Sequence, residues 1–463
     1  MGFFCCLSFL WDIIHINKHL STPSETDGCQ RIETRICALP DDLLLRILEY
    51  VPTEDAVATS ILSKRWRYVW TMLPRLEFKD EGSESLGFFI EKSLQLHKAP
   101  KLDCLIVEIG PRCPADIDVG KWVENAVNRG LRKLDFDIFG TAKPTIFPKS
   151  LYTCDTLVVL TLSNKILVDV SSPASLPSLL YLNLLNVVYK DEDSLVRLLS
   201  SSPVLEGLMV SRHEDDNLNN FTVKVCSLDT LFYDGTRLKN EVEDDDDDDD
   251  DLNGSLVIDS PALTKLDLIG VWDYCLIENM PCLDVAYIST VPNPDDMFLR
   301  SLSSVIHLHL LFTKSMVACC NAIKFSQLIE FYFFPDNLVD WLMPLMFLLQ
   351  NSPKLKSLTI ENDFEGRLPL SWNQPSYIPG CLLSHLETFR WKGYGGREDE
   401  KKLLMTYILA NSKCLKTVEI SLLATCNLEE RQKELESMPR ISQSSQLVIS
   451  TKMLWRFNGM TFP

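Results

Sequence analysis

The sequence predicts an α/β protein: a short helical module, then an open solenoid of parallel strands and helices, then a closing C-terminal block. Three observations predict this class. Apolar residues recur at helical spacing between residues 35 and 78, a strand-like pattern returns from Leu102 onward, and a helix-rich block follows Cys381. A chain of 463 residues with 46% hydrophobic content is long enough for more than one domain.

The N-terminal module is predicted to contain three short helices. The first begins at Leu39–Asp41, whose central proline is tolerated because the first turn of a helix leaves its N–H groups unpaired. Pro52 ends this helix, and Thr53 is expected to cap the second one. A third turn places Trp66 and Trp70 on one face. About 45 residues can barely bury a core, so the module is expected to bind a partner.

The ordered string from Arg35 to Trp70 resembles an F-box. In that family the module binds the Skp-type adaptor of a cullin ubiquitin ligase. The bland alternative is that the same residues only pack a local helical bundle. Carried over residue by residue, the resemblance implies adaptor contacts at Leu39, Pro40, Leu43, Ile47, Val57, Ser60, Leu62, Ser63, Arg65 and Trp66.

The strand-like pattern has three apolar positions, the first and second separated by two residues and the second and third by one. Its first positions step by 26, 22, 26 and 23 residues between Leu131 and Leu228, which is within the range of leucine-rich repeats. Leu228 and Leu283 begin weaker members. Helical segments are expected between strands, as at 193–199 and 341–349, and to end before the Ser-Pro pairs at Ser202, Ser260 and Ser352. Pro344 is expected to mark a kink or a first turn.

The block after Cys381 resembles the FBD module that follows leucine-rich repeats in plant F-box proteins. The predicted fold is therefore an N-terminal three-helix F-box followed by an open leucine-rich-repeat solenoid of parallel β-strands plus helices, closed by an FBD module. The expected domains are an N-terminal extension at 1–30, the F-box at 31–78, the solenoid at 79–375 with an acidic disordered insertion at 240–253, the FBD module at 376–450 and a tail at 451–463.

Side chains between the fixed apolar positions should point away from the core, toward a concave surface, because they alternate along a strand. We expect target recognition on this surface, although each residue could equally belong to an ordinary solvated face. Mixed aromatic, amide and charged groups favour a protein or peptide ligand. The candidates are Tyr181, Asn183, Lys265, Asp267, His307, His309, Glu330, Tyr332 and Arg390, with Val159, Thr161, Ser357 and Thr359 at equivalent positions.

Composition argues against several other functions. The net charge is −19, and ten acidic residues lie between Glu241 and Asp251, so no basic surface for nucleic acid is indicated. The 15 cysteines show no zinc spacing and are interpreted as reduced core residues. His307 and His309 share a strand face but lack a third ligand, so no metal site is predicted. No catalytic motif is present, and we expect no enzyme activity and no cofactor.

Two segments are harder to interpret. The apolar stretch from Phe3 to Trp11 lacks the basic start of a signal peptide and is too short to span a bilayer, so no membrane association is expected beyond lipidation of Cys5 and Cys6. The run Asp244–Asp251 is expected to be an extended insertion, with docking of a basic partner as the alternative.

The resemblance implies a substrate-recognition subunit of an SCF-type E3 ubiquitin ligase in the cytoplasm and/or nucleus. The F-box would bind a Skp-type adaptor and, through it, a cullin, while the solenoid binds an unknown protein target. One alternative is a repeat scaffold that acts outside a ligase. Another is a receptor whose target binding depends on a small molecule.

Overall fold

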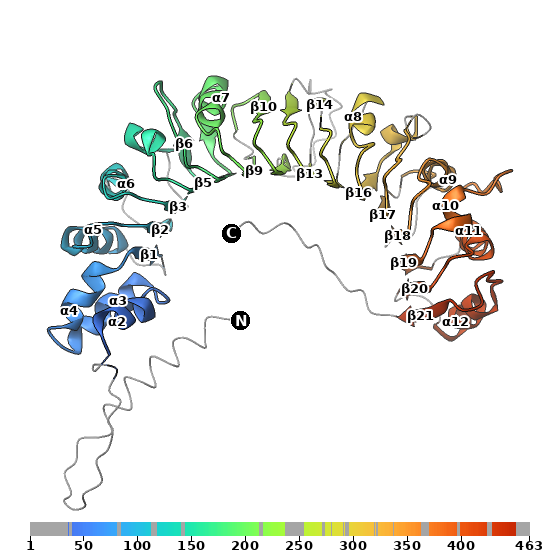
Figure 1. The fold of residues 1–463 in the computed structure, drawn as a ribbon, viewed down its shortest axis with the longest axis horizontal. Coiled ribbons are helices and arrows are strands. Elements are labelled where there is room, and N and C mark those ends of the chain that lie inside the picture. Colours follow the sequence, from blue (N-terminus) through green and yellow to red (C-terminus); the bar gives the residue numbers. More distant parts are fainter. Residues whose placement is uncertain are drawn as a thin grey trace, which may run out of the picture. The chain divides into compact units, whose positions relative to one another are not determined.

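A computed structural model describes most of the chain. The chain, drawn in Figure 1, divides by its internal contacts into two compact units, Met1–Gly140 and Thr141–Pro463. The described residues are 36, 39–80, 85–112, 118–139, 144–212, 216–236, 254–270, 274–278, 280–289, 291, 296–318, 320, 323–336, 338–362, 370–395, 399–423 and 428–450. The predicted extension at 1–30, the aspartate run Asp244–Asp251 and the tail at 451–463 lie outside them.

The first unit begins with the helical module. It contains α2 (Asp41–Leu48), α3 (Thr53–Ala58), α4 (Trp66–Val69) and the 3-10 turns η2 (Thr59–Ile61) and η3 (Trp70–Met72). Pro40 precedes α2, and Asp41 and Asp42 occupy its first turn. Their negative charges interact favourably with the positive N-terminal end of the helix dipole. The predicted cap at Thr53 is wrong. Pro52 stands at the N-cap, and the Thr53 hydroxyl instead accepts a hydrogen bond from the Glu77 N–H at 2.8 Å.

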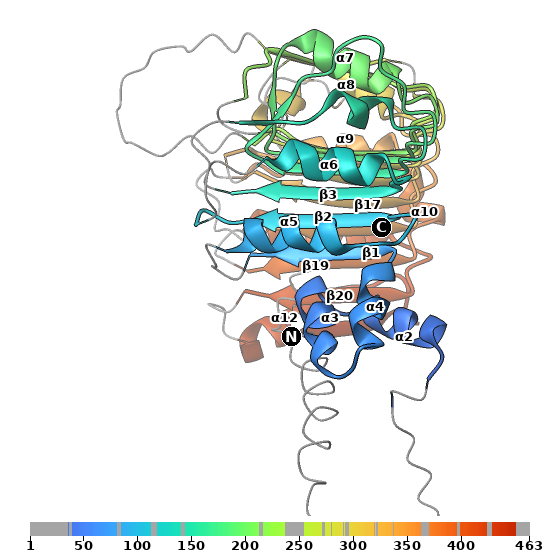
Figure 2. The ribbon, with the colours of Figure 1, turned by 90° about the vertical axis from the view of Figure 1, so that its left-hand side faces the viewer.

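Three parallel strands and two helices complete the first unit. The strands β1 (Arg75–Lys79), β2 (Cys104–Ile109) and β3 (Lys133–Ile138) alternate with α5 (Leu86–Leu96) and α6 (Val119–Val127). Figure 2 shows the strands stacked in order with both helices on one side of them. Leu76, Leu105 and Leu134 lie in register and are fully buried, so they form a continuous row of the core.

His97, just after α5, ties distant parts of the first unit together. Its Nε2 lies 2.7 Å from the Leu73 carbonyl oxygen, and its Nδ1 lies 2.6 Å from Nη2 of Arg129. A carbonyl oxygen only accepts and a guanidinium only donates, so Nε2 carries the proton and the ring is neutral. Burial lowers the pKa of His97 to about 4, with a smaller contribution from the nearby Arg129 charge.

The main sheet of the second unit confirms the predicted repeat architecture. All its adjacent strands are parallel, and each pairs with the strand of the next repeat. Their order is β5 (Val159–Asn164), β7 (Tyr181–Leu185), β9 (Gly207–Ser211), β11 (Thr230–Asp234), β13 (Lys265–Ile269), β15 (Val285–Ile288), β16 (His307–Phe312), β17 (Glu330–Pro335), β18 (Ser357–Glu361), β19 (Thr388–Tyr394), β20 (Thr417–Leu422) and β21 (Gln446–Ser450).

The second and third apolar positions of the predicted pattern form two buried rows across this sheet. Leu182, Leu208 and Leu231 lie in register in one row, and even the weaker member at Ala286 is fully buried there. Neighbouring repeats therefore bury each other's apolar residues, as a solenoid requires. At β21 the row is only half-buried, at Leu447.

Helices and short strands connect the strands of the main sheet. The helices are α7 (Glu192–Ser200), α8 (Asp296–Ser301), α9 (Leu342–Gln350), α10 (Gly380–Ser384), α11 (Asp399–Asn411) and α12 (Leu428–Ser437), with 3-10 turns η4 (Lys149–Thr153) and η5 (Lys314–Val317). Two small parallel sheets contain β4 (Thr145–Ile146), β6 (Ile166–Val168) and β8 (Val188–Tyr189), and β10 (Asn220–Lys224), β12 (Ser255–Asp259) and β14 (Tyr274–Glu278). Figure 1 shows the helices of this unit on one side of the main strands.

The prediction that helices end before Ser-Pro pairs is confirmed at Ser202 and Ser352 and is wrong at Ser260. α7 ends at Ser200 and α9 at Gln350, and the buried hydroxyls of Ser202 and Ser352 donate to carbonyls four residues earlier. Ser260 instead follows strand β12. Leu256 and Ile258 alternate with less buried residues there, which is a strand period. Pro344 lies in the first turn of α9, where no backbone donor is needed.

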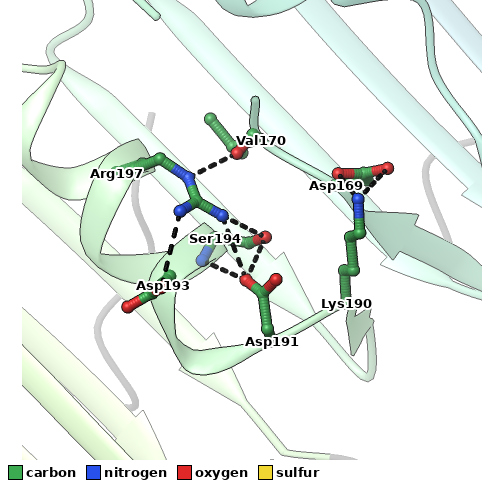
Figure 3. A network of polar contacts seen from close by, with 7 residues as sticks. All are labelled: Asp169, Val170, Lys190, Asp191, Asp193, Ser194 and Arg197. Carbon is green, nitrogen blue, oxygen red and sulfur yellow. Dashed lines mark hydrogen bonds and ion pairs between the residues drawn. The ribbon is translucent and has the colours of Figure 1, made fainter. Parts of the chain in front are cut away.

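Polar contacts fix α7 against the preceding repeat (Figure 3). Asp191 caps the helix, accepting a hydrogen bond from the Ser194 N–H at 2.6 Å. Arg197 donates through Nε to the Val170 carbonyl oxygen at 2.6 Å and through Nη2 to the same Asp191 carboxylate at 3.1 Å. One guanidinium thus connects its own helix cap to the backbone of the neighbouring repeat.

A buried ion pair holds the segment between β9 and β10. Arg212 and Asp216 approach to 2.7 Å, and their side chains are 1% and 0% exposed. Arg212 also donates to the Tyr233 hydroxyl at 3.3 Å and to the Leu218 carbonyl oxygen, while Asp216 accepts from the Leu218 N–H at 2.8 Å. Phe221 packs under the guanidinium, whose carbon lies 5.6 Å from the ring centroid. This pair is therefore fully hydrogen-bonded within the core.

The described cysteines carry free thiols, but not all are core residues. Cys104, Cys154, Cys275, Cys320 and Cys381 are buried, whereas Cys226, Cys282 and Cys414 are exposed, so the core interpretation is wrong for these three. None of the described helices is long and apolar enough to cross a bilayer.

Candidate functional site

The helical module exposes apolar side chains that its own core does not use. Leu44 and Leu48 are buried, whereas Leu43 and Ile47, four residues apart on α2, are 40% and 38% exposed. Leu62 is 38% exposed at the end of η2. The amphipathic pattern of α2 therefore divides into a core side and a side with uncovered aliphatic groups.

Most of the predicted adaptor contacts are at least partly exposed. Pro40, Leu43, Ile47, Leu62 and Ser63 are exposed, and Leu39, Val57, Ser60 and Arg65 are half-buried. Trp66 differs from these residues, because only 2% of it is exposed. It packs inside the unit with Leu44 and Val69 buried around the same helices, so its side chain supports the surface instead of presenting it.

Arg65 has a local role that the sequence did not reveal. Its Nε donates to the Asp41 carboxylate at 2.6 Å, and its Nη2 donates to the Leu39 carbonyl oxygen. It therefore fixes the start of α2 from the opposite end of the module. Sequence reasoning also missed Tyr50 and Ile61, which are 86% and 83% exposed. The sequence feature that could have identified them is that both are apolar and neither belongs to the buried set of helix positions.

The second candidate surface is the face of the main sheet that lies opposite its buried rows, here called the open face. It corresponds to the surface predicted to be concave. Residues between the second and third apolar positions line up in register across it and form what we call the central row. Its members are Thr161, Asn183, Met209, Phe232, Asp267, Tyr287, His309, Tyr332, Thr359, Arg390, Glu419 and Val448.

The sequence candidates fall in two adjacent rows of the open face. Asn183, Asp267, His309, Tyr332 and Arg390 belong to the central row. A neighbouring row contains Val159, Tyr181, Lys265, His307, Glu330 and Ser357. The prediction missed Met209, Phe232 and Tyr287, although each stands between the second and third apolar positions of its repeat, which is the signal that identifies them.

Three members of the central row are more buried than an open surface suggests. Thr161, Asp267 and Thr359 are each below a tenth exposed. Asn183, on the adjacent strand, donates a hydrogen bond to the Thr161 hydroxyl at 3.0 Å. The open face is therefore uneven, with small or short residues lying between larger ones.

Aromatic rings stack along the central row. The ring centroids of Tyr287 and His309 are 4.3 Å apart, and those of His309 and Tyr332 are 4.7 Å apart with an interplanar angle of 12°. Burial between the tyrosines lowers the pKa of His309 to about 4, so this imidazole is neutral at pH 7. Lys392 lies over Tyr332, with its Nζ 4.9 Å from the ring centroid and 3.0 Å from the hydroxyl.

Charged groups at the same end of the open face are paired. Lys392 forms an ion pair with Glu361 at 3.0 Å, and Arg390 forms one with Glu419 at 2.8 Å. His307 Nδ1 lies 3.0 Å from the Glu330 carboxylate. Across the described residues, no three His, Cys, Asp or Glu side chains converge in a group that could hold a metal ion.

A helical module with uncovered aliphatic groups, followed in the chain by a leucine-rich-repeat sheet with an open face, defines an F-box substrate-adaptor type of protein. Family models agree with each part. The F-box domain matches residues 36–78, the LRR repeats of FBD-associated F-box protein At5g56370 match residues 119–247, and FBD matches residues 374–420.

Curated proteins of Arabidopsis thaliana are similar over nearly the whole chain. "Putative F-box/FBD/LRR-repeat protein At1g22000" is 77% identical over 465 residues, covering 98% of this chain and 100% of that protein. F-box/FBD/LRR-repeat protein At4g26340 is 40% identical over 430 residues, covering 89% and 99%. The chain belongs to the plant F-box/FBD/LRR-repeat protein family.

Proposed function

We propose that this protein is the substrate-recognition subunit of an SCF-type E3 ubiquitin ligase. The observation that carries the proposal is the set of exposed apolar side chains on the module that matches the F-box model. A Skp-type adaptor is the partner that an F-box implies. The adaptor connects to a cullin, and the open face of the repeat sheet holds the protein to be ubiquitinated.

The exposed side of α2 is suited to docking. Leu43 and Ile47 are neighbours one helical turn apart, so one apolar groove of a partner can cover both. Complete burial of a Leu or Ile side chain contributes ~1.5–3 kcal/mol, and the exposed fraction of each here is worth about 1 kcal/mol when covered. Arg65 keeps the Leu39–Asp41 start of this helix in place.

Positioning accounts for the proposed activity. A target held on the open face has its lysines kept near a ubiquitin-loaded enzyme recruited by the cullin, which raises their effective concentration. The side chains of this protein carry no step of the transfer. It is therefore a non-catalytic receptor, acting in the cytoplasm and/or nucleus with the rest of the ligase.

The test is co-expression with a Skp-type adaptor followed by size-exclusion chromatography. We expect a stable one-to-one complex with the wild-type chain. The double variant Leu39→Ala, Pro40→Ala and the double variant Leu43→Glu, Ile47→Glu should both lose it. The second variant is the sharper one, because its residues are exposed and their replacement leaves the core of the unit intact.

The control is Phe88→Glu, which places a glutamate on an exposed apolar residue of α5 outside the F-box match. This variant should still bind the adaptor. The proposal fails if the folded wild-type chain forms no complex, or if the Leu43/Ile47 variant binds as well as Phe88→Glu does. An adaptor complex that never recruits a cullin would instead support a repeat scaffold acting outside a ligase.

A further inference from the structure

The open face contains one carboxylate that its surroundings leave without compensation. Asp267, on β13, is only 7% exposed. Within the described part of the chain, no side chain or backbone group forms a hydrogen bond or an ion pair with it. The basic residues Lys392 and Arg390 of the same face, by contrast, each have an acidic partner.

Aromatic residues flank Asp267 on both sides of the central row. Phe232 on β11 and Tyr287 on β15 are its in-register neighbours. Adjacent strands lie ~4.8 Å apart, so the two side chains stand on backbones roughly 10 Å apart with the carboxylate between them. A guanidinium is the side-chain cation suited to these neighbours, because it can pair with a carboxylate and pack its planar face on aromatic rings.

Electrostatics at this position favour a cation. Burial raises the pKa of Asp267 to about 6, and the negative charge of Asp234 on β11 adds to the increase. Burial raises the pKa of Tyr287, and the negative charges of Asp267 and Glu330 add to the increase. Lys265 shares the strand face but forms no ion pair with Asp267 in the described structure, so the site remains negative.

We propose that Asp267, between Phe232 and Tyr287, binds a basic side chain of the target protein, arginine in preference to lysine. This inference rests on the proposed function, since it names the chemistry of the target that the open face would hold. A metal ion is not favoured, because no third ligand joins Asp234 and Asp267 among the described residues. A phosphorylated target is disfavoured by the same two negative charges.

The test uses a displayed library of random peptides selected on the purified full-length chain. We expect the enriched peptides to share an arginine or lysine at one position. A selected peptide, labelled for fluorescence anisotropy, should bind the Asp267→Asn variant at least tenfold more weakly than the wild type. Replacing its basic residue with citrulline, which is nearly isosteric with arginine but neutral, should weaken binding to the wild type by a similar factor.

The combination separates a direct contact from an indirect one. The citrulline peptide should lose no further affinity for Asp267→Asn, because the same interaction has already been removed. The control is Asp284→Asn, which removes an equal charge from an exposed aspartate just before β15 and should leave binding unchanged. Enriched peptides without a basic residue, or equal binding by Asp267→Asn and the wild type, overturn the proposal.

Failure of this inference is distinguishable from failure of the proposed function. Peptide binding is measured on the chain without adaptor, and adaptor binding is measured separately on the same variants. Asp267→Asn should keep its adaptor complex, since Asp267 lies outside the F-box match at residues 36–78. A chain that binds the adaptor but selects peptides without basic residues overturns only the inference.

Discussion

Replacing Arg212 by Met should destabilise the second unit more than any loss of a surface ion pair. The substitution keeps a long apolar stem but removes the charge. It leaves the Asp216 carboxylate, the Tyr233 hydroxyl and the Leu218 carbonyl oxygen without their common donor. Because Asp216 is completely enclosed, water cannot replace the guanidinium.

The expected cost follows from that enclosure. Removing one partner of a buried ion pair leaves an uncompensated charge and costs ~3–5 kcal/mol. The remaining hydrogen bond from the Leu218 N–H to Asp216 offsets only part of this. The double variant Arg212→Met, Asp216→Leu should recover a substantial share, because the unpaired charge is then absent as well.

The assay is urea unfolding followed by circular dichroism, with amide hydrogen exchange of β9 and β10 as a local readout. Lys190→Met is the matched control, since it breaks the surface pair of Lys190 with Asp169, whose side chains are 53% and 28% exposed. That variant should lose less than ~1 kcal/mol. If Arg212→Met costs no more than Lys190→Met, the argument from burial is refuted.

Three further outcomes are expected. The free energy of unfolding of the first unit should fall by about 1.4 kcal/mol between pH 7.5 and 5.5. The reason is that folded His97, with a pKa of about 4, stays neutral over this range, whereas the unfolded side chain takes up a proton as the pH falls through 6.5. His97→Gln should lack this dependence in urea titrations, and an unchanged slope would count against it. Asp267→Asn should raise the free energy of unfolding at pH 7.5 by about 1–3 kcal/mol relative to Asp284→Asn, because the raised pKa of Asp267 means that its ionised form disfavours the fold. This gain should shrink as the pH falls through 6, because the folded Asp267 then becomes protonated. Leu266→Ala should cost about 2–5 kcal/mol because its side chain is fully buried in the second unit, whereas Lys265→Ala, one residue away on the open face, should change the melting temperature little.

The repeat pattern predicted the sheet because one physical rule governs both. Apolar residues two apart on a strand share a face, so the second and third positions of each repeat form the two buried rows. The rule extends even to the weak repeat at Ala286. The separate expectation that helices end before Ser-Pro pairs failed at Ser260, which follows strand β12. A Ser-Pro pair marks where an element ends and not which type of element it is.

The candidate sites were less predictable, since they depend on residues far apart in the sequence. Asp267 could be placed on the open face from its spacing, but its position between Phe232 and Tyr287, 35 and 20 residues away in the sequence, depends on the strand register. Trp66 was expected at the adaptor surface from the resemblance, and the structure encloses it. The pair Arg212–Asp216 has an ordinary i, i+4 spacing, and nothing in the sequence distinguishes it from a surface pair.

The alternation of buried and open rows has a consequence for how members of this family can diversify. Most strands of the main sheet carry buried apolar residues at one set of positions and more exposed residues at the positions between them. A substitution in the central row can therefore change the partner without disturbing the buried rows. The side chains of the central row can vary while the buried rows stay constant. Exchanging the central row between two relatives should therefore transfer binding preference while both proteins remain folded.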